Sequence, residues 1–423
     1  MTEQVNYIYN KVSLWRINRM PEFGLIGACI YIAGFATPFK FKFDIPLFAL
    51  ALISILAAVS SFRNKSMTTL PLALSVFTFL ISTGVSILVS EDISRSIRLS
   101  TSLLPAVLLY FLVAGHFGGI KDTRRLYLTF SVVVIALASG LLWAFFSNRD
   151  MGPFGWISNM GSPILIVKND VTFLAVVSPL SLALLYHKSR SIYRVIAAIS
   201  LLLCIAVIGI FQSRVAVLTL VASITCFFML IRPKIGFACG SVILIMLLLV
   251  DGFMGFPLIE RFIHHWDGTG RIPLWLSAWK MFLDAPLLGH GPHTFILFYN
   301  SYLNNLSLPS WLFVDLRVVP WAHNLYLEIL AEHGIVGFIA LSVLLFSGLL
   351  AAWKLRNASF SEARILGYGA FAALFGFCLA SAAELTFLRQ WVVIMMFTLI
   401  GVIAQLLSLE SKERRKIDEK ISS

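Results

Sequence analysis

The sequence predicts an all-α protein that crosses a membrane many times, and three observations support this fold class. Of the 423 residues, 59% are hydrophobic and only 13% are charged, whereas a soluble domain is about half apolar and a quarter charged. The mean hydropathy is +0.88. Apolar runs of about 18 or more residues recur along the chain, and each can cross a hydrocarbon core roughly 30 Å thick. A β-barrel would instead show alternating segments of about ten residues.

The apolar runs predict about twelve membrane-spanning helices in one integral membrane domain, residues 1–423. The expected spans are 23–39, 45–62, 70–90, 99–117, 126–147, 170–187, 195–211, 214–231, 235–252, 325–353, 365–383 and 388–408. Lysine and arginine are enriched in cytoplasmic loops. With the N-terminus inside, the inner segments hold 21 of the 33 lysines and arginines. We therefore expect both termini in the cytoplasm, and residues 409–423 form a cytoplasmic tail that contacts anionic lipid.

Several other classes of protein do not fit. The net charge of +12 is concentrated in inner loops, which argues against nucleic-acid binding. The five cysteines fall inside expected spans and predict small buried residues, not disulfides or metal ligands. There is no metal-ligand spacing and no glycine-rich phosphate loop, and we expect no cleavable signal peptide. We therefore expect neither a metal nor a cofactor.

Two outer segments are long: 148–169, an irregular loop, and 253–322, which joins the ninth and tenth spans. The second is rich in tryptophan, which favours the headgroup level of a membrane. Within it a helix is expected from Thr269 to Asp284, because Thr269 can cap it and Pro suits its first turn. We therefore expect interfacial helices in this loop.

Polar residues gather where the long loop re-enters an apolar run, at His323, Asn324 and Glu328. Such residues are costly at a membrane helix unless they are paired or wet. Asn324 and Glu328 are four apart and share a helical face. A carboxylate or amide there can orient the imidazole of His323, as a general base requires. A lone histidine would more simply be interfacial, and His333 is expected to be a packing or interfacial residue.

Three arginines are expected at the same outer surface: Arg214, Arg271 and Arg389. Arginine binds phosphate oxygens through two parallel hydrogen bonds, so each can bind an anion. Each also has a simpler interpretation. Arg214 can extend toward the headgroups, Arg271 can pair with Asp267, and Arg389 can pair with Glu384. Two further sets complete the outer surface: Lys168, Asn169 and Asp170 at the sixth span, and the loop histidines His264, His265, His290 and His293, expected to be solvated or interfacial.

These residues resemble an O-antigen ligase of the O-antigen ligase/polymerase superfamily. That family pairs Arg-x3-Leu with a later His-[Asn/Ser/Gln]-x9-Gly-x2-Gly. The first motif matches Arg214 to Leu218, and the second begins at His323 and ends at Gly334 and Gly337. The loop from Arg271 through Pro286-Leu-Leu-Gly-His-Gly-Pro also resembles the family's loop pattern.

The resemblance implies a bacterial inner-membrane glycosyltransferase of the multi-spanning C type, with its site facing the periplasm. It implies transfer of O-antigen from undecaprenyl diphosphate to lipid A-core, without metal or cofactor. His323 would be the catalytic base, and Arg214, Arg271 and Arg389 would bind the diphosphate. Supporting residues would be Asn324, Glu328, Glu384 and Asn169.

Other functions stay open from the sequence. A polymerase of the same superfamily would use a second lipid-linked chain as acceptor, and related ligases act on other acceptors, including protein. A lipid-linked oligosaccharide flippase would place its polar residues near the bilayer midplane.

Overall fold

The structure is a computed structural model that describes residues 70–117, 119–147, 170–186, 190–253, 270–310 and 321–422, with the isolated positions 28, 29, 32, 255, 259, 260, 312 and 314. The expected spans at 23–39 and 45–62 lie outside the described residues, apart from those isolated positions. The expected loop at 148–169 lies outside them entirely.

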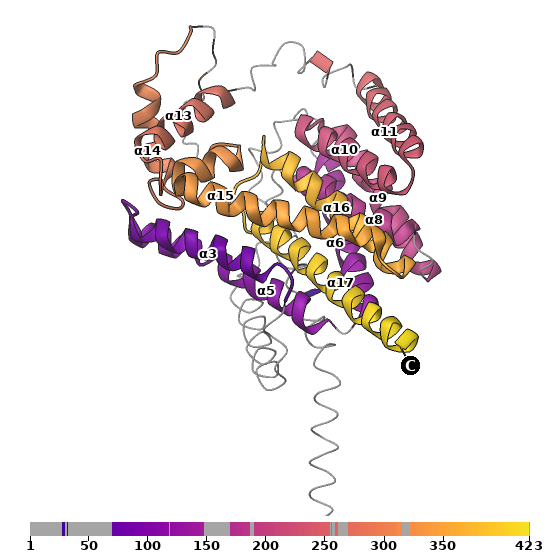
Figure 1. Ribbon diagram of the computed structural model, residues 1–423. Coiled ribbons are helices and arrows are strands. Elements are labelled where there is room, and N and C mark those ends of the chain that lie inside the picture. Colours follow the sequence, from indigo (N-terminus) through magenta and orange to yellow (C-terminus); the bar gives the residue numbers. More distant parts are fainter. Residues whose placement is uncertain are drawn as a thin grey trace, which may run out of the picture.

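Every element in the described part of the chain is helical (Figure 1). The elements are α3 (Ala73–Leu88), α4 (Ile93–Ser100), α5 (Leu103–His116), α6 (Ile120–Ser147), α8 (Asp170–Tyr186), α9 (Ser191–Phe211), α10 (Arg214–Ile231), α11 (Pro233–Phe253), α13 (Arg271–Asp284), α14 (Phe295–Asn304), α15 (Leu325–Lys354), the 3-10 turn η3 (Leu355–Asn357), α16 (Ser361–Ser381) and α17 (Gln390–Ser422). Eight helical stretches in the described residues are long and apolar enough to cross a membrane. The prediction of an all-α, multi-pass membrane protein is therefore confirmed.

Two expected boundaries differ from the structure. The expected span at 99–117 is preceded by the separate helix α4, which begins early because Asp92 caps it by accepting a hydrogen bond from Arg95 N at 2.9 Å. The expected tail at 409–423 continues α17 as a helix to Ser422. The start of this tail segment is held by Glu410, whose two carboxylate oxygens accept hydrogen bonds from Ser359 N at 2.9 and 3.0 Å.

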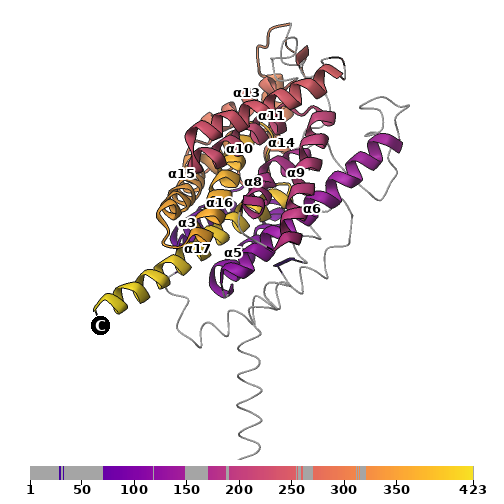
Figure 2. The same cartoon turned by 90° about the vertical axis from the view of Figure 1, so that its right-hand side faces the viewer.

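The directions of the packed helices follow from contacts at the end of α8. Tyr186 faces Phe227 in the second half of α10, with ring centroids 6.4 Å apart. Gly369 in the first half of α16 packs against Ala183 of α8. Helices α10 and α16 therefore run antiparallel, and the start of α10 lies at the same end of the bundle as the end of α16. We call this the α13 end, and Figures 1 and 2 show it opposite the C-terminus.

Helix α15 is broken near its start, and a turn of the long loop is inserted in the break. Gly334 has φ 63° and ψ −165°, which are not helical angles. The turn at 286–291 exchanges backbone hydrogen bonds with both sides of the break. These bonds are Ile335 N to Pro286 O at 2.8 Å, Val336 N to Leu287 O at 3.2 Å, His290 N to Ala331 O at 3.1 Å and Gly291 N to Glu332 O at 2.9 Å. The inserted turn thus satisfies backbone groups that a broken helix would leave unpaired in an apolar setting.

Two glycines make this insertion possible. Gly334 and Gly289 both have positive φ, at 63° and 68°. A Cβ on Gly334 would lie 2.3 Å from Leu287 O, and one on Gly289 would lie 2.3 Å from the carbonyl carbon of Glu332. Side chains other than hydrogen therefore do not fit at either position. This gives a physical reason for the first glycine of the His-Asn-x9-Gly-x2-Gly spacing and for the glycine in the Pro-Leu-Leu-Gly turn.

The buried carboxylate of Glu332 fastens the segment that follows the turn. The residue is 3% exposed. Its Oε2 accepts a hydrogen bond from His293 N at 2.7 Å, and its Oε1 accepts one from Phe295 N at 2.9 Å. The second bond caps the first residue of α14, a helix that the sequence analysis did not predict. Glu332 thereby ties the long loop to α15.

We expect Gly334→Ala to lower stability by at least about 1–3 kcal/mol, because it forces a side chain into a positive-φ position against a carbonyl. The measurement is thermal unfolding of the purified protein in detergent. The matched control is Gly84→Ala, since Gly84 lies in α3 with no atom within 4 Å of its added Cβ. Equal unfolding temperatures for the two variants would contradict the insertion.

We expect Glu332→Gln to lower stability by about 1–3 kcal/mol, because one amide oxygen cannot replace two acceptors and the amide N–H would face a backbone donor. Glu419→Gln, at an exposed position of α17, is the control. Limited proteolysis of the 286–304 segment is the second measurement. The proposed fastening is wrong if the Glu332→Gln protein resists both heat and protease as the wild type does.

Candidate functional site

The candidate site is built around the buried carboxylate of Glu384, just after α16. Its side chain is 6% exposed. Arg271, the first residue of α13, places Nη2 at 2.5 Å from Oε2 of Glu384. His323 places Nδ1 at 3.7 Å from Oε1. The structure therefore brings together three site residues from the sequence analysis that are far apart along the chain.

These neighbours lower the pKa of Glu384. Burial raises the pKa of this carboxyl, but the close approach of His323 and the charges of Arg271 and Arg389 outweigh burial and hold the pKa below its usual value. The carboxylate is therefore ionised at neutral pH. Because its pKa is lower in the folded protein than in the unfolded chain, this contribution to stability is present at neutral pH and is lost as the pH falls through the folded-state pKa.

His323 is held just before α15 in an unusual backbone conformation, with φ 51°. Asn324 is the N-cap of α15: its Oδ1 accepts hydrogen bonds from Tyr326 N at 3.0 Å and Leu327 N at 3.1 Å. The Nε1 of Trp321 donates a hydrogen bond to Nδ1 of His323 at 3.2 Å. The histidine side chain is 23% exposed. It is thus fixed in orientation and open on one side.

Glu328, expected to orient the imidazole, contacts other groups. Its Oε1 accepts a hydrogen bond from Thr386 Oγ1 at 2.5 Å, and its Oε2 accepts one from Ala322 N at 3.4 Å. The carboxylate that faces the imidazole is Glu384. Helical spacing misled the prediction because His323 lies before the helix, where its left-handed backbone turns the side chain off the helical face. Glu328 instead binds the backbone N–H of Ala322 and the hydroxyl of Thr386, which lie in two different segments of the site.

The other two arginines lie at the same end of the bundle. The Cζ of Arg389 lies 5.0 Å from the centre of the Trp321 ring, a cation–π contact. Arg214 begins α10, where Ser213 Oγ caps the helix by accepting from Ala216 N at 3.4 Å. Arg271 and His323 approach Glu384, and Arg389 lies against Trp321. Arg271 forms an ion pair with Glu384, and the charge of Arg389 also acts on that carboxylate.

Some positions named from the sequence fall elsewhere. Asn169, Lys168, Asp267, His264 and His265 lie outside the described residues. Asp170 is the first residue of α8. The start of α8 lies at the α13 end of the bundle, because Phe173 packs edge-on against Trp391, with ring centroids 5.5 Å apart.

His290 and His293 were expected to be solvated or interfacial; they are not solvated, since they are only 8% and 6% exposed. His290 Nδ1 lies 2.8 Å from Oε1 of Glu91, and its Nε2 lies 3.1 Å from Met281 O. Burial, with a smaller effect of the charge on Arg95, lowers the pKa of His293 to about 4. His290 is buried because it lies in the turn that is inserted into α15, and His293 follows that turn and is held by Glu332. In the sequence, only Gly289 in the turn and Gly334 in α15 indicate that the two segments approach each other closely.

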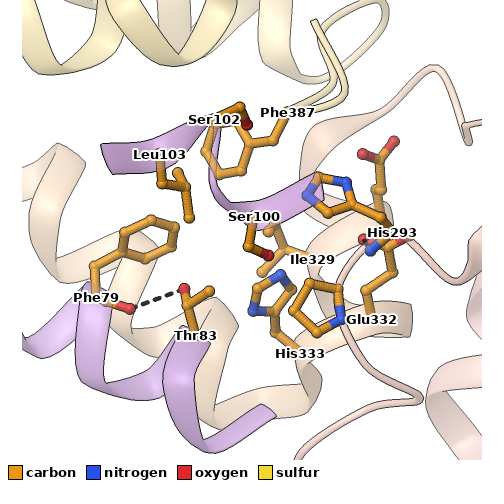
Figure 3. A pocket seen from close by; sticks show the side chains of 12 residues that line it. Phe79, Thr83, Ser100, Ser102, Leu103, His293, Ile329, Glu332, His333 and Phe387 are labelled. Atoms are coloured by element: carbon orange, nitrogen blue, oxygen red, sulfur yellow. Dashed lines mark hydrogen bonds between the residues drawn. The ribbon is translucent and has the colours of Figure 1, made fainter. Parts of the chain in front are cut away.

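A small buried cavity lies beneath this turn, with a volume of about 10 Å³. Figure 3 shows the imidazoles of His293 and His333 and the hydroxyl of Ser100 around the same space. Glu328 and Glu332 also line it. His333 is 4% exposed, as expected for a packing residue. The cavity is about the size of one water molecule, so it is too small for a sugar.

Chemically, the site combines a partly exposed imidazole with fixed cations around one carboxylate. Such cations can bind an anion and stabilise negative charge as it develops. The imidazole can accept a proton from a hydroxyl. Within the described ranges, no group of three or more His, Cys, Asp or Glu residues is arranged to hold a metal ion.

The comparisons with known proteins agree with the motifs. Residues 199–342 match the family model described as O-antigen ligase. The matched segment contains Arg214, Arg271 and His323, whereas Glu384 and Arg389 follow it. A comparison with curated proteins finds no match. The similarity to this family therefore covers residues 199–342 of the 423-residue chain, the segment that holds both motifs.

Proposed function

We propose that the protein is an O-antigen ligase, a glycosyltransferase that moves a polysaccharide from undecaprenyl diphosphate onto a sugar hydroxyl of lipid A-core. The observation that carries this proposal is the convergence of Arg271, Arg389 and His323 on Glu384. Arg271 lies within the long loop and His323 directly follows it, so the loop must fold back to bring them together. Their convergence supports a site that binds an anionic leaving group beside a base.

The proposed reaction is an inverting displacement without a metal. The guanidinium groups of Arg271, Arg389 and Arg214 bind the diphosphate and stabilise its charge as the glycosidic bond breaks. His323 takes the proton of the acceptor hydroxyl as that oxygen attacks the anomeric carbon. Glu384 keeps Arg271 in place before the donor arrives. Asn324 and Glu328 hold the backbone around His323.

The proposed setting is a bacterial inner membrane, with about twelve spans in a type C glycosyltransferase fold. The distribution of lysine and arginine supports cytoplasmic termini. The α13 end, which is opposite the C-terminus, would then face the periplasm, where both lipid-linked substrates present their sugars. Residues 253–322 form the periplasmic loop.

A polymerase of the same superfamily is the second candidate, because the matched segment does not separate the two activities. The purified protein can be given labelled undecaprenyl-diphosphate polysaccharide with lipid A-core, with a second lipid-linked repeat, or with a pilin-like protein, each in EDTA. We expect label to move to lipid A-core only. Transfer to a lipid-linked repeat would make the protein a polymerase, and flipping without any transfer would make it a transporter.

We expect His323→Gln to reduce the transfer rate by about 10²–10⁴-fold, because a positioned base contributes that much. Donor binding should remain, since the arginines are unchanged. The measurements are single-turnover transfer and binding of labelled donor by the same preparation. Near-wild-type transfer by a folded His323→Gln protein would show that the base lies elsewhere.

We expect Arg271→Gln to weaken donor binding and transfer by at least about tenfold, and Arg271→Lys to restore them only in part because lysine lacks the planar fork. Arg271→Gln also leaves Glu384 buried without its partner, which costs about 3–5 kcal/mol of stability. The double variant Arg271→Gln/Glu384→Gln separates these effects, since it should regain stability but not activity.

The matched control for Arg271 is Lys280→Gln, an exposed cation on the same helix. It should bind donor and transfer polysaccharide as the wild type does. If the double variant regained both stability and transfer, the role of Arg271 would be structural only.

A further inference from the structure

The Nδ1 atom of His323 faces two groups with opposite requirements. Trp321 Nε1 lies 3.2 Å away and Glu384 Oε1 lies 3.7 Å away. An indole N–H can only donate a hydrogen bond, whereas an ionised carboxylate can only accept one. Nδ1 must therefore be unprotonated to bind Trp321 and protonated to bind Glu384. The two contacts belong to different forms of the imidazole.

The described structure shows the form that binds Trp321. The 3.2 Å contact is a hydrogen bond by distance, and the 3.7 Å contact is longer than one. In agreement, Oε1 of Glu384 is buried and has no hydrogen-bond partner among the described residues. A neutral imidazole that accepts at Nδ1 carries its proton on Nε2. This buried carboxylate oxygen is unpaired among the described residues, and an imidazole that carries a proton on Nδ1 can pair with it.

The resting tautomer is the wrong one for a base that acts through Nε2, because that nitrogen already holds the proton. We propose that Trp321 is a positioning residue that keeps His323 in this resting tautomer until the donor binds. When the indole withdraws, Nε2 loses its proton to water and Nδ1 gains one from water, so the net charge is unchanged. Nδ1–H then donates to Glu384, and Nε2 is free to accept the proton of the acceptor hydroxyl. This inference rests on the proposed role of His323 as the base.

Arg389 supplies the link to the donor. Its guanidinium lies over the Trp321 ring, 5.0 Å from the centroid, and so contributes to holding the indole beside His323. Arg389 is also a proposed ligand of the diphosphate. A bound diphosphate draws Arg389 toward its oxygens and removes the contact above the indole. Binding of the donor and activation of the base are thereby coupled, so the base is not formed in the absence of donor.

The variant that tests this is Trp321→Phe, which removes the indole N–H and keeps an aromatic ring beneath Arg389. The tautomer is read from the ¹⁵N chemical shifts of protein labelled at histidine in nanodiscs, with His323 assigned by its loss in His323→Gln. We expect Nδ1 of the wild type to be mainly unprotonated. In Trp321→Phe the ratio of the Nδ1–H tautomer to the Nε2–H tautomer should rise roughly fivefold, which corresponds to the net free energy of one hydrogen bond.

The matched control is Trp279→Phe, which changes a tryptophan of α13 that is 45% exposed. Its His323 signals should match those of the wild type. Protonated Nδ1 in the wild type, or identical tautomer ratios in Trp321→Phe and wild type, would overturn the proposal.

Inorganic diphosphate tests the coupling to the donor. Added to the wild type, it should shift the His323 signals toward Nδ1–H, and it should have little further effect in Trp321→Phe. If diphosphate binds but leaves the wild-type signals unchanged, the coupling is wrong. These spectra need no transfer reaction, so the result for the tautomer does not depend on the result of the ligase assay. A tautomer shift in a protein that transfers nothing to any acceptor would refute the proposed function alone.

Discussion

The insertion of residues 286–291 into the break of α15 is the interaction on which the rest of the site depends. A helix that breaks within an apolar bundle exposes backbone groups that no water can satisfy. Here the inserted turn pairs with N–H and C=O groups on both sides of Gly334. Since α13 ends at Asp284, immediately before the turn, this pairing also sets where α13 lies. The position of Arg271 relative to His323 is therefore a consequence of backbone hydrogen bonds some distance from either residue.

The carboxylate of Glu384 is the group that the charged and titratable residues of the site approach. A guanidinium at the first residue of a helix is unfavourable to the helix dipole, and a buried carboxylate is unfavourable without a partner. Arg271 and Glu384 offset each other's cost by pairing at 2.5 Å. The same carboxylate keeps a second oxygen directed at His323. A single acidic side chain thus connects the anion-binding half of the site to the base.

The helices of the bundle could be predicted well because a long apolar run is both the cause of membrane insertion and directly visible in the sequence. The helix at 271–284 could also be predicted, since Pro273 and Pro286 mark its ends. Helix α14 and the burial of His290 and His293 could not. Glycine, proline and histidine between apolar segments usually indicate a solvated turn, and only the complementary shape of the broken α15 turns that segment inward.

By itself, the sequence determined the all-α membrane class, the arginine and histidine residues of the motifs, and the glycines at which close approach is required. Those properties follow from composition and local spacing. Only the tertiary structure decided that Glu384 faces His323 while Glu328 holds the neighbouring backbone, and that Trp321 occupies Nδ1. The physical reason is that spacing along a helix governs contacts between residues three or four apart, whereas contacts between distant segments are set by how helices pack and where one of them breaks.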